Sequence, residues 1–285
     1  MSGPRILILG ATSLVGRFLT PRLAAAGDRP LALSRRSPDG EAAAEWLVGD
    51  LLDAGLAERL PPLSTVYSLS PIWLLPDVLP MLIGAGARRV VAFSSTSRFT
   101  KLESPVAAER AVAAKLAESE ARVIALSEAA GVAWIILRPT LIYAEGLDGN
   151  VSRLAALIRC LGVLPLAGRG EGLRQPVHGD DLATAAMAAA ESPIRSGAYD
   201  LPGGETLSYR HMAERVFEGM GRRPRLIPIP APLWALGFWL ASPWLPGTTA
   251  AMGARMSADL TFDAAPARRD LGWSPRAFHP DFMQP

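Results

Sequence analysis

A short apolar strand that runs into a glycine-bounded turn and then into an amphipathic helix constrains this chain most. The strand covers Ile6 to Leu9, and the turn lies between Gly10 and Gly16. Gly10 permits a tight turn where a Cβ would clash, and Gly16 lets the helix pack close to the strand. The N–H groups of the first helical turn, together with the helix dipole, would face an anion. This segment therefore predicts a binding site for the pyrophosphate of a dinucleotide.

Ser13 stands where a three-glycine fingerprint has its middle glycine, so the strand before and the helix after the turn strengthen the prediction. The residues predicted to surround the pyrophosphate are Gly10, Thr12, Ser13, Leu14, Val15 and Gly16.

The composition is that of an enzyme-sized globular protein. A chain of 285 residues with 49% hydrophobic content can bury the core of one large domain or of a domain with an added lobe. The 29 basic and 27 acidic residues nearly balance, and no basic, aromatic-rich patch indicates nucleic acid. The single cysteine, Cys160, excludes an internal disulfide, and we expect no metal site. No signal-peptide pattern is present, so the expected location is cytoplasmic.

Short apolar runs alternate with helical patterns through the first half of the chain. The predicted strands are Arg5 to Leu9, Leu31 to Ser34, Glu45 to Val48, Thr65 to Leu69, Val90 to Ser94 and Trp134 to Leu137. Several of these are apolar throughout, as in a parallel sheet covered by helices on both faces. With right-handed crossovers, this pattern predicts an α/β protein with a Rossmann-type doubly wound parallel sheet.

Two further features divide the chain. The longest helix should begin at Ser104-Pro105 and end at Gly131, and after Pro139 the alternation becomes irregular and rich in Gly and Pro. We expect residues 1–145 to form mainly the dinucleotide-binding domain. Residues 146–285 should form mainly a smaller C-terminal substrate lobe, interleaved with the sheet.

The end of the second predicted strand indicates which dinucleotide is bound. An enzyme that prefers NAD usually has Asp or Glu here, whereas this chain reads Ser34-Arg35-Arg36. Guanidinium groups suit a 2′-phosphate, so these arginines favour NADP over NAD as the cofactor. The alternative is that Arg35 and Arg36 are a solvated pair of loop residues. Asp50 and Leu51 follow the third strand, where Asp50 would either contact the adenine or cap the next helix.

Several motifs together resemble the extended and atypical short-chain dehydrogenase/reductase superfamily, its NAD-dependent epimerase/dehydratase group. The matching segments are Gly10 to Gly16, Gly49-Asp50, Phe93 to Thr96, Leu137 to Tyr143, Arg174 to Asp181, Gly197 to Leu201 and Asp270 to Arg276. The resemblance covers nearly the whole chain. It implies that Ser94 and Pro139 also contact the cofactor, but it says little about the substrate, because this scaffold supports many chemistries.

One family feature is missing. Members carry a Tyr and, four residues later, a Lys that lowers the pKa of the phenol so that it exchanges a proton with the substrate. None of the four tyrosines here has a lysine four residues later. The corresponding positions hold Val112 and Leu116, while Lys115 lies about 100° around the helix from the expected lysine.

Other residues are therefore the catalytic candidates. Thr96 occupies the family's Ser/Thr position, where it would hold a carbonyl, and Lys101 and Tyr143 are candidate proton donors. The alternatives are that Thr96 is a turn hydroxyl, that Lys101 is a solvated loop charge and that Tyr143 is a packed aromatic ring. His178 with Asp181 could form an acid/base pair, or the segment could be a helix entry with Asp180 or Asp181 as the cap.

These features predict an NADP(H)-binding reductase of a small hydrophobic or glycosylated substrate. The alternative is a non-catalytic dinucleotide-binding sensor or accessory protein, resembling NmrA-like regulators.

The uncharged, proline-interrupted segment 226–254 leaves only Leu233 to Ser242 as a clean helix, too short for the ~20 residues of a transmembrane span. It would pack within the small lobe, line a pocket, lie at a membrane interface or contact a partner, including a second copy in a homodimer.

Overall fold

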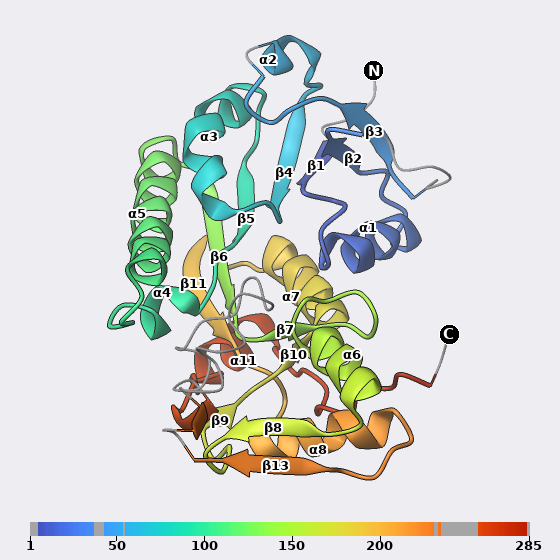
Figure 1. Ribbon diagram of the computed structural model, residues 1–285. Helices are drawn as coiled ribbons and strands as arrows, with labels where there is room; N and C mark the ends of the chain where they lie inside the picture. The colour runs from blue at the N-terminus through green and yellow to red at the C-terminus, as the bar shows by residue number, and fades with distance from the viewer. Residues whose placement is uncertain (1–4, 37–42, 54, 231–232, 235–255, 284–285) are drawn as a thin grey trace.

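A seven-stranded sheet forms the centre of the computed structural model, which describes residues 5–36, 43–53, 55–230, 233–234 and 256–283 (Figure 1). Its strands are β1 (Arg5–Leu9), β2 (Leu31–Ser34), β3 (Glu45–Val48), β4 (Leu63–Ser68), β5 (Arg89–Phe93), β6 (Ala133–Pro139) and β11 (Ser196–Leu201). They lie in the order β11-β6-β5-β4-β1-β2-β3, and every neighbouring pair is parallel. The predicted doubly wound parallel sheet is confirmed.

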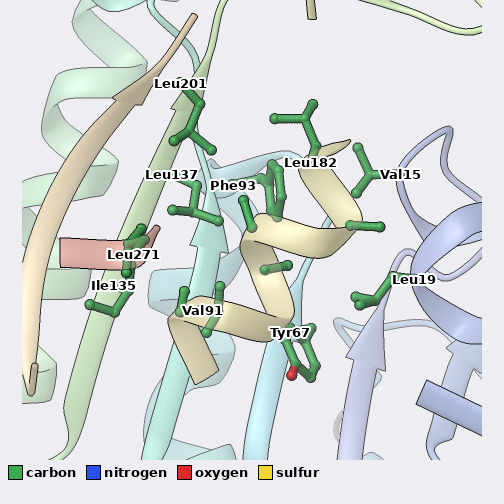
Figure 2. Close-up of a cluster of buried hydrophobic side chains, with 14 of the residues drawn as sticks. Val15, Leu19, Tyr67, Val91, Phe93, Ile135, Leu137, Leu182, Leu201 and Leu271 are labelled. Atoms are coloured by element: carbon green, nitrogen blue, oxygen red, sulfur yellow. The ribbon is translucent and has the colours of Figure 1, made fainter. Parts of the chain in front are cut away.

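Helices cover both faces of this sheet because alternate strand residues point to opposite sides. Ile8, Val91 and Ile135 face one buried cluster with α1 (Gly16–Ala25), α7 (Gly179–Glu191) and α11 (Ala265–Leu271). Figure 2 shows part of this cluster, with Leu19 of α1 and Leu182 of α7 beside the sheet.

Leu7, Val90 and Ile136 face the other cluster, with the 3-10 turn η1 (Ile72–Leu74), α3 (Leu75–Gly84) and α5 (Ala107–Ala129). The short helix α2 (Leu56–Arg59) lies between β3 and β4 in the chain.

The longest helix has the predicted end but a later start. Gly131 adopts a left-handed φ of +66° just beyond α5, as the sequence predicted. Helix α5 begins at Ala107 rather than at Ser104, because the Ser104 hydroxyl accepts a hydrogen bond from the Val106 N–H in a turn that precedes the helix. Pro21 lies inside α1, which continues to Ala25.

A smaller lobe lies below the sheet in Figure 1 and contains three short strand pairs. The pairs are β7 (Ile142–Tyr143) with β10 (Val177–His178), β8 (Leu164–Ala167) with β13 (Leu226–Ile229), and β9 (Leu173–Arg174) with β12 (Leu207–Ser208). Helices α6 (Val151–Leu161) and α8 (Tyr209–Gly219) enclose its buried cluster. After this lobe begins, the chain returns to the sheet through α7 and β11, so the two parts are interleaved.

The uncharged segment is described only in part. Residues 226–229 form β13, but most of the predicted helix Leu233 to Ser242 and of the predicted apolar contact through 226–254 lies outside the described residues. Among the residues that are described, no helix combines the length and the apolar character needed to cross a bilayer.

Candidate functional site

The glycine turn between β1 and α1 has the geometry that a phosphate-binding turn requires. Gly10 has φ +78°, and a Cβ there would lie 2.8 Å from the backbone nitrogen of Ser70. A Cβ on Gly16 would lie 2.2 Å from the carbonyl oxygen of Ala11. A side chain at either position would therefore displace backbone, which explains both glycines.

Two backbone donors at this turn, the N–H groups of Leu14 and Val15, are free among the described residues. The Ser13 hydroxyl accepts from the Gly16 N–H at 3.2 Å, whereas in the described part of the chain the N–H groups of Leu14 and Val15 have no partner. Thr12 is exposed beside them. Free N–H groups at the start of a ten-residue helix suit a phosphate anion, so these residues fit the pyrophosphate of a dinucleotide.

The arginines predicted to bind a 2′-phosphate lie directly after β2. Arg35 and Arg36 are exposed, and neither forms an ion pair with any described residue. The Ser34 hydroxyl accepts from the Arg36 N–H at 3.3 Å, which fixes the start of the bend. The two guanidinium groups are therefore available to an anion.

Asp50 and Leu51 lie after β3, the next strand of the sheet. The Asp50 carboxylate accepts from the Leu52 N–H at 2.9 Å, so it stabilises a turn. Its other oxygen has no hydrogen-bond partner among the described residues, and the adenine contact stays a prediction. Leu51 packs partly buried against the cluster that contains α3 and α5.

Thr96 and Lys101 flank the short helix α4 (Ser97–Thr100), which contacts α5. Thr96 is buried, and both its N–H and its hydroxyl donate to the carbonyl oxygen of Pro139, at 3.2 and 3.1 Å. The Thr96 hydroxyl must therefore turn away from Pro139 before it can donate to a substrate. Ser94 donates its hydroxyl to Glu120 at 2.5 Å.

A buried charge cluster behind Thr96 was not predicted. Glu120 of α5 is fully buried and accepts hydrogen bonds from Ser94, Arg98 and Arg138, with the Arg138 Nη2 at 2.6 Å. These arginines also lie over the ring of Phe99, with guanidinium carbons 4.9 and 5.3 Å from its centroid. The cluster joins the ends of β5 and β6 to α4 and α5. In the sequence, Glu120 does not stand out from Glu118, which lies two residues earlier on the same helix.

Helix α5 contains no tyrosine, and Val112 and Leu116 are the residues at the positions that the sequence predicts for the family's catalytic pair. Val112 is 37% exposed, and Leu116 is buried against the core. Lys115 is exposed, and its Nζ lies 4.8 Å from the centroid of the Trp73 ring in η1.

Tyr143 belongs to a different buried cluster from the core residues of α5. It belongs to the core of the smaller lobe and contacts the His178 ring edge-on, with centroids 5.0 Å apart. His178 in turn contacts Phe18 of α1, on the face of the sheet opposite α5. Burial raises the pKa of the Tyr143 phenol, and the nearby Glu145 carboxylate raises it further.

The hypothesis of a His178–Asp181 acid/base pair is wrong, because His178 Nε2 lies 3.2 Å from Glu145, and Asp181 binds Arg276. The segment does cap α7, but the capping side chain is that of His178 rather than Asp180 or Asp181. His178 Nδ1 accepts from the N–H of Asp180, the second residue of α7.

Comparisons with known proteins agree with this geometry. The sequence model of the NAD dependent epimerase/dehydratase family matches residues 77–201. An uncharacterised protein of Mycobacterium tuberculosis is 27% identical over 242 residues, which are 80% of this chain and 24% of that protein, so the chain spans about a quarter of that relative.

A 3-diazoavenalumate denitrifying reductase of a Streptomyces species is 30% identical over 224 residues, covering 66% of this chain and 72% of that protein. In fold, the chain is similar to MoeE5, solved in complex with UDP-glucuronic acid and NAD. The TM-score is 0.74 at 22% identity, covering 96% of this chain and 94% of that one. This chain belongs to the NAD dependent epimerase/dehydratase family.

Proposed function

We propose that this protein is an NADP(H)-dependent reductase of a small hydrophobic or glycosylated substrate. The observation that carries the proposal is the pair of exposed, unpaired guanidinium groups at the end of β2, beside a turn with free backbone donors. A 2′-phosphate accepts charge-assisted hydrogen bonds from such groups. NAD, which lacks that phosphate, is the alternative cofactor.

Bound NADPH would supply a hydride, and the chain's own residues would position the acceptor. The Thr96 hydroxyl oxygen keeps free lone pairs while its proton is donated to Pro139. After a rotation of its side chain, the same hydroxyl would donate to a carbonyl oxygen and hold it in place. The ion pair of Glu120 with Arg98 ties α4, which begins directly after Thr96, to α5.

The proton would come from Lys101, since α5 offers neither the family phenol nor its lysine. Tyr143, the other predicted donor, lies in the smaller lobe on the side of α1 and α7, so the catalytic proposal rests on Thr96 and Lys101.

Names of similar proteins support the two halves of the proposal separately. The Streptomyces relative is named a reductase, which supports hydride transfer to a small molecule. MoeE5 was solved with a nucleotide sugar, which supports a glycosylated ligand for this scaffold.

A second candidate function is dinucleotide sensing without turnover. It is favoured by the hydrogen bond that holds the Thr96 hydroxyl on Pro139 and by Val112 and Leu116 on α5. A sensor would bind NADPH and change its conformation or its partner, but would not oxidise the cofactor.

One assay distinguishes the reductase from the sensor. The purified protein is mixed with NADPH and a panel of aldehydes, aromatic ketones and nucleotide-linked keto sugars, and nicotinamide absorbance is followed. The reductase proposal expects acceptor-dependent oxidation that is faster with NADPH than with NADH. If NADPH binds but no acceptor promotes oxidation, the sensor is supported and the reductase is contradicted.

A further inference from the structure

A pocket in the smaller lobe is lined by residues that are not among the predicted cofactor contacts. It has a volume of about 470 Å³ and opens between the loop after β7, the last turn of α6 and the C-terminal segment. This volume lies within the ~300–1,000 Å³ that is usual for small-molecule pockets. Tyr143 and His178 contribute to its wall, on the α1 side of the sheet, whereas Thr96 and Lys101 flank α4 beside α5.

The acidic groups in this pocket already have donors. The Glu145 carboxylate lies 3.2 Å from His178 Nε2 and accepts from the Asp281 N–H at 3.3 Å. Because His178 Nδ1 accepts from Asp180, Nε2 carries the proton in the neutral ring and donates to Glu145. Asp281 accepts from the Met283 N–H at 2.8 Å.

One of the basic groups is also paired. Arg276 donates to Asp180 and Asp181, at 2.7 and 2.9 Å, so its charge is balanced within the protein.

The groups that remain free are donors. Tyr143 is only 1% exposed, lines the pocket and has no hydrogen-bond partner for its hydroxyl among the described residues. Arg159 lies over the Phe282 ring at 5.6 Å and has no carboxylate partner in the same part of the chain. The ring of the exposed His279 likewise has no hydrogen-bond partner within those ranges.

The Tyr143 side chain is held in place by burial, and its hydroxyl is free to donate to a ligand that carries an acceptor atom. We propose that this pocket binds a small oxyanion, a carboxylate or a phosphate monoester, through Arg159, His279 and the Tyr143 hydroxyl. The guanidinium group suits both anions because it donates two parallel hydrogen bonds. The Tyr143 and Phe282 rings would cover the apolar part of the ligand.

Calorimetry on the full chain tests the proposal with two probes, 4-hydroxybenzoate as the carboxylate and glucose 6-phosphate as the phosphate ester. At least one should bind saturably, and the stronger of the two identifies the class of anion. Arg159→Ala should weaken that binding at least tenfold. Tyr143→Phe, which keeps the ring contacts with His178 and Phe278, should weaken it several-fold. Arg153→Ala is the matched control, because Arg153 is exposed on the same helix but does not line the pocket.

Three results would overturn the proposal. They are no saturable binding of either probe, equal weakening by Arg153→Ala and Arg159→Ala, and displacement of the probe by saturating NADPH. The last would place the probe in the cofactor's own phosphate site. Thermal unfolding of each variant confirms that it is folded, so loss of binding reports on the pocket.

Discussion

At the scale of single residues, Thr96 is the side chain on which the reductase proposal depends. Thr96→Val keeps the shape but removes the hydroxyl that would hold the acceptor. Turnover should fall about 10- to 100-fold, the effect of one hydrogen bond worth about 1.5–3 kcal/mol, while NADPH affinity stays unchanged. Thr96→Ser retains the hydroxyl and should keep most of the activity. Steady-state kinetics and calorimetry measure the two effects, and a Val variant with wild-type turnover contradicts the role.

Glu120 is the residue whose loss should destabilise the fold most clearly. Glu120→Ala leaves Arg98 and Arg138 without their buried carboxylate, which typically costs about 3–5 kcal/mol. Glu118→Ala, on the exposed side of the same helix, should change the unfolding free energy by less than about 0.5 kcal/mol. Urea unfolding measures the stability of both variants against that of the wild type. Equal stabilities would show that the Glu120 cluster contributes little.

The sequence predicted the turn residues better than it predicted this cluster. Gly10 and Gly16 are required by local backbone geometry, which a short motif reveals. Glu120, Arg98 and Arg138 come from different segments and meet only when β5, β6 and α5 pack together. No local pattern could therefore show that they pair.

At the scale of elements, ion pairs join α1, α7 and the C-terminal segment. Arg22 and Arg276 both bind Asp180 at 2.7 Å and hold its pKa at about 2, although partial burial opposes them. Because the pKa is depressed in the folded state, Asp180 stabilises the fold above pH ~4 and loses this effect as the pH falls toward 2.

Asp180→Asn should therefore lower the unfolding free energy at pH 7. We expect only about 1 kcal/mol, because both arginines are over 40% exposed and solvent screens the pairs. The difference from the wild type should shrink as the pH falls from 4 to 2. Asp77→Asn, which breaks the exposed pair with Arg122, is the control and should have little effect at pH 7. A difference that is independent of pH would contradict the ion-pair account.

The residues of helix α5 lead to a prediction about epimerase activity. The sequence predicts that Val112 and Leu116 replace the family's phenol and lysine, a change that would remove general acid/base assistance worth ~10² to 10⁴ in rate. Interconversion of UDP-glucose and UDP-galactose should be undetectable or very slow, as measured by chromatography of the products. Epimerisation at a rate ordinary for an enzyme would mean that another pair of residues supplies the proton transfer.

Strands were predicted well where they are apolar. The predicted β1, β2 and β3 agree with the structure at both ends, and β4 and β5 are displaced by one or two residues. β11 was recognised only as a motif, because Ser196, Gly197 and Asp200 interrupt its apolar pattern. The two-residue strands β7 and β10 are too short for any periodic signal.

At the scale of the whole molecule, the parallel sheet follows from the order of strands and helices along the chain. That order does not reveal on which side of the sheet Tyr143 lies, because its strand β7 pairs with β10 in the smaller lobe. The sequence therefore grouped Tyr143 with Thr96 as catalytic candidates, while the structure places it beside His178 and a separate pocket.

The central claim is that this chain binds NADP(H) through Arg35 and Arg36, and calorimetric titration with NADPH and NADH tests it most directly. The 2′-phosphate should make NADPH bind about 10- to 100-fold more tightly, which corresponds to about 1.5–3 kcal/mol. Arg35→Asp should reduce or reverse this preference without changing the NADH affinity greatly. Equal affinities of the unmodified protein for NADPH and NADH would contradict the account.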